Sequence, residues 1–330
     1  MSADNNRRTD LLLPGLDGAN PLAFLAAVGA LRALTLGRPE WHPRMYWKPH
    51  RGRWCPGLLL EATFPEGPAP DTVADALMQH ADKPEQMWTS DLADAAVKTN
   101  SKWENTLKFP APGYREFCLA ARWQSDAGDR TMADYAAAWG TDAVVQNDKK
   151  LERVQRTFLD FTAGNQKFRS MLAEVVESCK ETDLRQTLFA GMNYQVGATS
   201  LRWDPLDEKR QYALQAVDPT QTAKSKNPIV ADPGANRLAI CAVPLLPLIP
   251  QARRAAQPGR TGARQRAWRW PVWTRPANLD VVRCLLALEE ILTDPVPHGP
   301  LTARGIVQVY ESNITMPSGH YRCFSPAGAV

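Results

Sequence analysis

One apolar stretch near the start of the chain places the strongest constraint on its fold. Residues 22–36 are apolar or small at almost every position, and Arg32 is their only charge. Asn20 is a good helix N-cap, Pro21 suits the first helical position, and Gly37 favours a helix end. The pattern predicts a helix, and a helix that is apolar on nearly every face is buried on nearly every face. We expect it to be the central helix of an N-terminal domain.

The composition is that of a folded soluble protein. The chain has 330 residues, 44% of them hydrophobic and 22% charged, which is enough for one large domain or two ordinary ones. The formal net charge is +4, so the protein as a whole is only mildly basic. The cysteines are scattered without a C-x-x-C pair, as is typical of reduced thiols in a cytoplasmic protein. They are Cys55, Cys118, Cys179, Cys241, Cys284 and Cys323.

Neither an export signal nor a membrane span is expected. Arg7 and Arg8 precede the apolar run 11–13, as they would in a twin-arginine signal. Pro14 interrupts that run, whereas the apolar core of a signal needs roughly 7–15 residues. After the first helix there is no uncharged apolar run of roughly 18 residues, the length that a span requires. We therefore expect a cytoplasmic protein with no membrane partner.

The remaining pattern predicts an α+β fold of mixed strands and helices, with a largely buried N-terminal helix and, as one option, a helix-rich second part. We expect strands at 11–13, 118–123, 201–203, 211–215, 305–311 and 321–324, and two or three more between 44 and 64. We expect further helices at 71–79, 132–139, 149–156, 167–179, 182–190, 235–240 and 279–292. One division is an N-terminal α+β domain at 1–145, a helical segment at 146–200 and an α+β region at 201–330. One composite domain is the alternative.

No pattern in the sequence predicts a catalytic centre. Phosphate-binding glycine loops, the G-x-S-x-G elbow and the H-E-x-x-H motif are all absent from the sequence. His42, His50 and Cys55 lie close together in sequence, but zinc sites have tighter paired spacing and a fourth ligand. The same objection applies to His320 and Cys323. We therefore expect a protein that is not an enzyme and has no catalytic residue, metal or cofactor.

A cationic and aromatic tract stands out between Ala252 and Ala277. Seven arginines and three tryptophans lie there without a single Asp or Glu. Guanidinium groups pair with phosphates, and indole rings offer flat faces to unpaired bases. The tract therefore predicts a nucleic-acid-binding segment; the alternative is a surface loop leading into a strand whose rings pack inward. The candidate contact residues are Arg264, Arg266, Trp268, Arg269, Trp270 and Arg275.

Short turns that bear amides and cations form a second group of candidates. Asn and Gln side chains can pair with adenine edges, and Arg and Lys with guanine edges or phosphates. Such turns could therefore recognise a few base pairs in a duplex groove. The alternative is that the amides cap helices or bridge loops. The candidates are Asn165, Gln166, Lys167, Asn193, Gln195, Arg202 and Arg210.

Several stretches resemble one family of CRISPR-associated proteins. The segment 13–32, with Asn20-Pro-Leu-Ala-Phe-Leu-Ala-Ala-Val-Gly-Ala-Leu-Arg32, is similar to the N-terminal signature of large-subunit-like proteins from type I-G (formerly I-U) systems. In that family a helix of this pattern follows a short strand and a glycine turn. The segments 160–168, 203–207, 234–239 and 264–273 resemble the same group.

The resemblance implies a non-catalytic subunit of a crRNA-guided, Cascade-like effector complex in antiviral defence. Such a subunit binds double-stranded target DNA, recognises the protospacer-adjacent motif, helps to form the R-loop and recruits a separate helicase–nuclease. Its implied partners are crRNA and the backbone and guide-processing subunits. Two alternatives remain open: a scaffold whose arginines contact acidic partner proteins, and a nuclease with dispersed acidic metal ligands.

Overall fold

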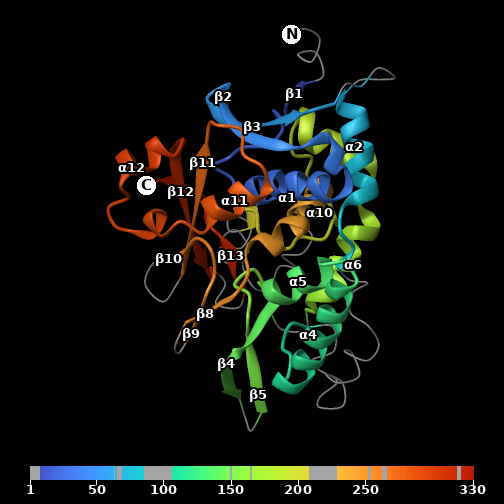
Figure 1. The fold of residues 1–330 in the computed structure, drawn as a ribbon, viewed down its shortest axis with the longest axis vertical. Coiled ribbons are helices and arrows are strands. Elements are labelled where there is room, and N and C mark those ends of the chain that lie inside the picture. The colour runs from blue at the N-terminus through green and yellow to red at the C-terminus, as the bar shows by residue number, and fades with distance from the viewer. Residues whose placement is uncertain are drawn as a thin grey trace, which may run out of the picture.

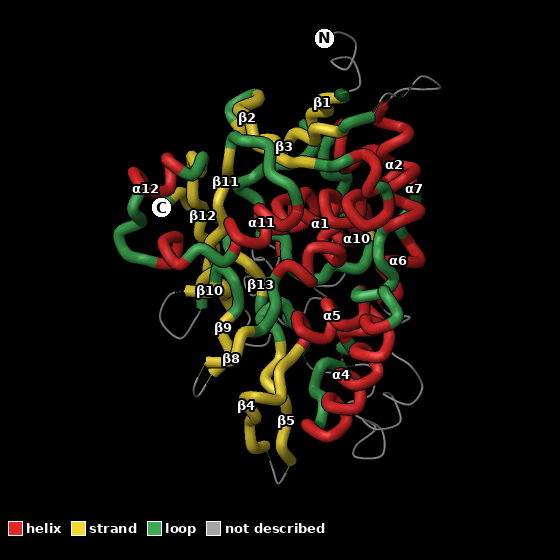
Figure 2. Tube along the Cα trace, in the orientation of Figure 1, coloured by secondary structure: helices red, strands yellow, loops and turns green. Residues whose placement is uncertain are grey.

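The computed structural model has a mixed α+β architecture with several small antiparallel sheets (Figure 1). Most of the helices lie on one side of the molecule, and the largest sheet lies on the other (Figure 2). The structure describes residues 8–62, 64, 69–84, 106–148, 151–163, 166–207, 229–251, 254–261, 266–317 and 321–330.

The helices of the described residues are mostly short. The α-helices are α1 (Pro21–Gly37), α2 (Ala69–His80), α4 (Ala111–Asp126), α5 (Thr131–Trp139), α6 (Phe168–Ser178), α7 (Glu181–Arg185), α10 (Pro233–Ala242), α11 (Leu279–Leu286) and α12 (His298–Ala303). The 3-10 turns are η1 (Pro39–Trp41), η5 (Val243–Leu245) and η7 (Glu289–Leu292). A π-helical turn, η4 (Gln186–Ala190), continues α7.

The strands form antiparallel sheets of two to five strands. One sheet has the order β1-β3-β2, from β1 (Thr9–Leu12), β3 (Arg53–Leu60) and β2 (Arg44–His50). The largest has the order β10-β11-β12-β13, with β14 also paired to β12. Its strands are β10 (Arg260–Thr261), β11 (Ala267–Trp273), β12 (Ile306–Thr315), β13 (Cys323–Phe324) and β14 (Gly328–Ala329). The hairpins pair β4 (Gly140–Asp148) with β5 (Leu151–Arg156), β6 (Gln195–Val196) with β7 (Val230–Ala231), and β8 (Ile249–Gln251) with β9 (Arg254–Ala256).

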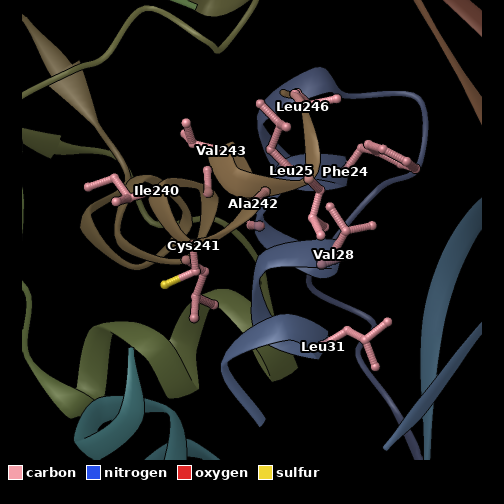
Figure 3. Close-up of a cluster of buried hydrophobic side chains, with 14 of the residues drawn as sticks. Phe24, Leu25, Val28, Leu31, Ile240, Cys241, Ala242, Val243 and Leu246 are labelled. Carbon is pink, nitrogen blue, oxygen red and sulfur yellow. The ribbon is translucent and has the colours of Figure 1, made fainter. Parts of the chain in front are cut away.

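The predicted N-terminal helix is confirmed as the centre of the core. The side chain of Asn20 accepts a hydrogen bond from the backbone N of Ala23 at 3.1 Å, which caps α1. Every residue from Pro21 to Leu34 is buried. The apolar face formed by residues such as Val28 packs against α10 (Figure 3). Arg32 is buried too, and it forms an ion pair with Asp82.

Gly29 lets α1 and α10 approach closely. A Cβ built on Gly29 would lie 1.9 Å from the backbone oxygen of Leu238 in α10. That separation is far below any van der Waals contact, so a larger residue would push the two helices apart. The absence of a side chain at Gly29 therefore sets the spacing between α1 and α10, which are far apart in sequence.

Three sequence predictions of local structure are wrong, and one of them is the strand predicted at 201–203, where the structure has no strand. Residues 118–123 belong to α4 rather than to a strand, because Tyr114, Phe117 and Ala121 recur at helical spacing and bury one face. Residues 149–156 were expected to be helical, but the described part, 151–156, is the strand β5 paired with β4. Pairing and the burial of Val154 override the helical preference of the charged residues around it.

Other predicted elements are confirmed with shifted ends or lie outside the structure. Residues 305–311 correspond to β12, and 279–292 correspond to α11 followed by η7. The predicted strand 211–215 lies outside the described residues. Buried side chains from all three ranges of the proposed domain division form one hydrophobic cluster. None of the described helices has the length and apolar character needed to cross a membrane.

Candidate nucleic-acid interface

The tryptophans of the cationic tract are core residues. Trp268 and Trp270 have exposed fractions of 0%. Trp270 donates a hydrogen bond from Nε1 to the backbone oxygen of Gly18 at 2.8 Å, and the Trp268 ring lies 5.5 Å from that of Phe324 and 5.9 Å from that of Phe24. Alternate residues of a strand face the same side of a sheet, and this side of β11 packs on α1. The prediction that these rings stack on bases is therefore wrong.

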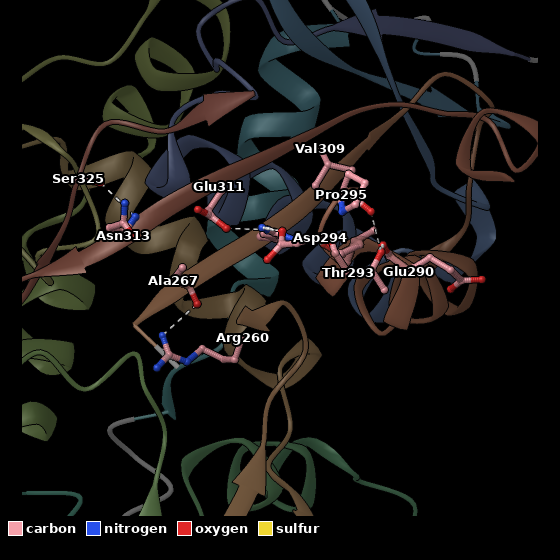
Figure 4. Close-up of polar contacts among 12 residues, drawn as sticks. Arg260, Ala267, Glu290, Thr293, Asp294, Pro295, Val309, Glu311, Asn313 and Ser325 are labelled. Carbon is pink, nitrogen blue, oxygen red and sulfur yellow. Dashed lines mark hydrogen bonds and ion pairs between the residues drawn. The ribbon is translucent and has the colours of Figure 1, made fainter. Parts of the chain in front are cut away.

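Arg269 is engaged inside the protein, on the opposite face of β11. Its guanidinium group pairs with Glu311 at 2.6 Å and with Asp294 at 2.5 Å, and it donates to the carbonyl oxygen of Thr293 at 2.9 Å. The close-up in Figure 4 shows Glu311, Asp294 and Thr293 gathered at this point. Burial acts to lower the pKa of Arg269, but hydrogen bonds to Asp294 and Glu311 outweigh it and raise the pKa. The predicted phosphate contact by Arg269 is therefore also wrong.

The other arginines predicted in the tract have different placements. Arg266 is exposed just before β11, and its backbone oxygen accepts a hydrogen bond from the N of Ile314 at 2.6 Å. Arg275 is exposed just after β11. Both stay candidate phosphate contacts. Arg264 lies outside the described residues, as do Arg210 and Asn165 from the second group of candidates.

A hollow at the start of α6 brings together three predicted residues. It has a volume of about 410 Å³, and we call it the α6 hollow. Gln166 and Lys167 line it from one segment, and Arg202 lines it from another. These residues come from two turns that are separate in sequence, and the fold makes them neighbours. Ser200 and Thr199 add hydroxyl groups, which donate to Asp207 at 2.6 Å and to Glu174 at 2.7 Å. These two carboxylates also line the hollow.

Contacts within the protein hold Gln166 and Arg202 at the α6 hollow. The Oε1 of Gln166 accepts a hydrogen bond from the backbone N of Ala163 at 3.2 Å, and no acceptor among the described residues engages its Nε2. Arg202 is buried, with a left-handed φ of 65°. Its guanidinium carbon lies 4.0 Å from the ring centre of Tyr321, which holds the cation against an aromatic face. The hollow thus presents a fixed cation beside an amide donor.

The loop that carries Asn193 and Gln195 has a structural role. Gln195 donates from Nε2 to Asp183 at 2.7 Å, so its amide bridges two segments, as the alternative interpretation held. The backbone N of Asn193 donates to Asp232 at 2.5 Å, and its side chain is exposed. Asp232 also caps α10 through the N of Ala235 at 2.6 Å. Neither candidate lines the α6 hollow.

A second hollow, of about 280 Å³, contains arginines that are not among the predicted site residues. Arg156, Arg260 and Arg322 line it, and we call it the arginine pocket. Arg260 lies in the cationic tract and Arg156 at the end of a basic run, so composition gave a weak signal for both. Nothing in the sequence marks Arg322, because its proximity to the other two exists only in the fold.

Comparisons with known proteins assign no family. No protein-family model matches the chain, and none of the curated proteins matches it. Within the part of the chain that the structure describes, no group of three or more His, Cys, Asp or Glu side chains is arranged to hold a metal ion.

Proposed function

We propose that the protein is a non-catalytic, nucleic-acid-binding subunit of a type I CRISPR effector complex. The observation that carries this proposal is the convergence of Gln166, Lys167 and Arg202 on the α6 hollow. Gln166 and Lys167 belong to one of the stretches that resemble the type I-G large-subunit-like family, and Arg202 directly precedes another, 203–207. The geometry and the resemblance thus point to the same region of the molecule.

The chemistry of the α6 hollow suits contact with a duplex. Lys167 adds a positive charge to the lining that can attract a phosphate, whereas the Nε2 of Gln166 can donate to a base edge or to a phosphate oxygen. Arg202 is held rigidly, so it contributes fixed positive charge. Within the cationic tract only the exposed arginines remain candidates for phosphate contact, because Trp268, Arg269 and Trp270 are engaged in the protein. In this proposal a short adjacent motif is recognised by such side chains, and the longer target sequence is recognised by pairing with crRNA.

The complex itself is tested by the RNA that the protein carries. We expect the tagged full chain, expressed in its own host, to co-purify with short RNAs that contain CRISPR repeat sequence, together with other effector subunits. Sequencing of the bound RNA against an untagged strain checks this. If proteins co-purify without repeat-derived RNA, the scaffold alternative replaces the proposal.

Contact by the α6 hollow is tested with a charge-reversal pair. We expect Lys167→Glu to weaken binding of the full chain to duplex DNA and to flatten the dependence of log K on log [salt], because one phosphate contact is lost. Arg51→Glu is the matched control, since Arg51 is exposed in the turn between β2 and β3 and the charge change is the same. Fluorescence anisotropy across a salt series measures both. Equal affinities for the two variants would remove the hollow from the interface.

A further inference from the structure

Three cations converge on the arginine pocket from segments that are far apart in sequence. Arg156 ends β5, Arg260 begins β10, and Arg322 lies just before β13. Each side chain is half-buried, so each keeps a face toward the hollow. Arg260 also stacks on the ring of Phe158, with its guanidinium carbon 4.7 Å from the ring centre. The fold has therefore gathered guanidinium groups that would repel one another without a counter-charge.

Only one carboxylate among the described residues pairs with these guanidinium groups. Arg156 forms an ion pair with the fully buried Asp160. Arg322 donates to the backbone oxygen of Asp160 at 3.0 Å, and Arg260 donates to the backbone oxygen of Ala267 at 3.3 Å (Figure 4). Backbone oxygens satisfy hydrogen bonds but carry no net charge. The pocket is therefore left with more positive charge than its own carboxylate neutralises.

The pKa shifts of Arg260 and Arg322 agree with an excess of positive charge in the pocket. Burial, and next the charge of Arg322, lower the pKa of Arg260 to about 10. Burial and the charge of Arg156 lower the pKa of Arg322, although Asp160 opposes the change. A lowered pKa means that the protonated guanidinium is less favourable here than in water. A bound anion would neutralise the excess positive charge.

The walls of the pocket are fixed by hydrogen bonds. The side chain of Gln155 both donates to the backbone oxygen of Ala255 at 3.1 Å and accepts from its N at 2.9 Å. Gln257 accepts from the N of Phe158 at 2.8 Å and donates to the backbone oxygen of Leu246 at 2.8 Å. These amides tie β5 to the segment around β9. A preformed site loses less entropy when a ligand binds.

A glycine turn positions Arg260. Gly259 has a φ of 76°, which favours glycine, and a Cβ there would lie 2.2 Å from the backbone oxygen of Arg269. The backbone oxygen of Gly259 in turn accepts a hydrogen bond from the N of Arg269 at 2.8 Å. The turn is thus pinned to the buried strand β11, and the next residue, Arg260, is directed by it.

We propose that the arginine pocket binds a phosphate group of a nucleic-acid strand. A guanidinium group can donate two parallel hydrogen bonds to phosphate oxygens, and the negative charge of the phosphate offsets the excess of cations. The identity of the strand rests on the proposed function, whereas the phosphate specificity rests on the pocket alone. The group is an internal phosphodiester or a phosphate at a strand end, and oligonucleotides with and without a 5′-phosphate separate the two.

The arginine pocket and the α6 hollow are linked near the C-terminus. Arg202 lines the α6 hollow and contacts the ring of Tyr321. The next residue, Arg322, lines the arginine pocket. Consecutive residues therefore join the two sites in the chain. This adjacency would let the arginine pocket serve as a second phosphate contact for a strand bound at the α6 hollow.

The pocket itself is tested with inorganic phosphate on the full chain. At ionic strength held constant with chloride, phosphate should raise the Tm of the wild-type protein and of the control Arg51→Gln, since a ligand that binds only the folded state stabilises it. The increase should disappear in Arg260→Gln and in Arg322→Gln. If phosphate stabilises the wild-type protein no more than chloride does, the pocket proposal is overturned, and this comparison does not depend on the folding of any variant.

The nucleic-acid strand is tested with single-stranded oligonucleotides. We expect Arg260→Gln to lower affinity about tenfold or more and to make the slope of log K against log [salt] shallower by about 1. Arg260→Lys, which keeps the charge but not the paired hydrogen bonds, should fall between Arg260→Gln and the wild-type protein. A loss confined to the 5′-phosphorylated oligonucleotide identifies a terminal phosphate, and an equal loss for both identifies an internal one.

The outcomes separate this inference from the proposed function. If Lys167→Glu weakens DNA binding while phosphate has no specific effect, the proposed function stands and the arginine pocket is excluded. If phosphate stabilises the protein but no nucleic acid binds, the proposed function and the nucleic-acid strand are both overturned.

Discussion

Two arginines three residues apart illustrate how position decides the role of a guanidinium group. Arg269 faces Glu311 directly across the β11–β12 pair, so its charge is neutralised inside the protein. Arg266 lies outside that strand and is exposed. Guanidinium groups with full sets of internal partners stabilise the fold, whereas exposed ones remain able to meet a phosphate.

These two residues give opposite predictions. We expect Arg269→Met to lower the free energy of unfolding by about 1–3 kcal/mol, because it removes charge-assisted hydrogen bonds from a buried position. The DNA affinity of the Arg269→Met variant should stay unchanged at a temperature where the variant is folded. Arg266→Met should leave stability within about 0.5 kcal/mol and weaken DNA binding. Urea unfolding and anisotropy measure the two properties, and a stability loss at Arg266 larger than at Arg269 would contradict the assignment.

The packing of α1 on α10 is the element-scale feature on which the core depends. Both helices are buried along most of their length, and they meet across a glycine (Figure 3). Interiors are packed as densely as organic crystals, so they cannot absorb an added methyl group between two backbones without moving one of them.

Gly29→Ala tests this contact. We expect a loss of about 3 kcal/mol or more, at the upper end of overpacking effects, because the added Cβ would meet the Leu238 carbonyl. Gly299→Ala in α12 is the control, since a Cβ there meets nothing within 4 Å. That substitution should be neutral or stabilising by up to about 1 kcal/mol. Urea denaturation followed by circular dichroism compares the two, and similar stabilities would contradict the close approach of the helices.

Some of these features could be predicted from the sequence, and others could not. The cap at Asn20 and the apolar length of α1 are local signals, and both are confirmed. The strand-like window at 118–123 was too short to reveal the helical spacing of Tyr114, Phe117 and Ala121. Trp268 and Trp270 alternate with Arg269, which is the period of a strand with one apolar face. This alternation indicates where the two rings face better than the arginine and tryptophan content of the tract does. The arginine pocket could not be predicted, because its residues meet only through the fold.

At the scale of the whole molecule, one hydrophobic cluster joins the proposed ranges 1–145, 146–200 and 201–330. Cys55, Cys179 and Cys241 are buried, one in each range. Burial raises the pKa of Cys179 to about 12 and that of Cys241 to about 11. At pH 8 burial therefore keeps both thiols protonated and shielded in the folded protein, and unfolding makes them reactive.

These thiols report whether the core opens as one unit. With iodoacetamide at pH 8, we expect Cys284, which is exposed, to react without denaturant. Cys55, Cys179 and Cys241 should become reactive together, at one urea concentration. Cys179 and Cys241 belong to the hydrophobic cluster, and Cys55 lies on β3, whose Leu58 and Leu60 belong to it. Mass spectrometry of the labelled peptides checks this. Separate midpoints would show that the three ranges unfold as independent domains.

The burial of α1 has a consequence for the synthesis of the protein on the ribosome. Pro233, the first residue of α10, is added roughly 200 residues after Gly37, the last residue of α1. At the usual pace of translation this delay lasts about 10–40 s. Throughout that interval the most apolar segment of the nascent polypeptide lacks its main packing partner. Chaperones that shield apolar segments during synthesis should therefore raise the yield of folded protein.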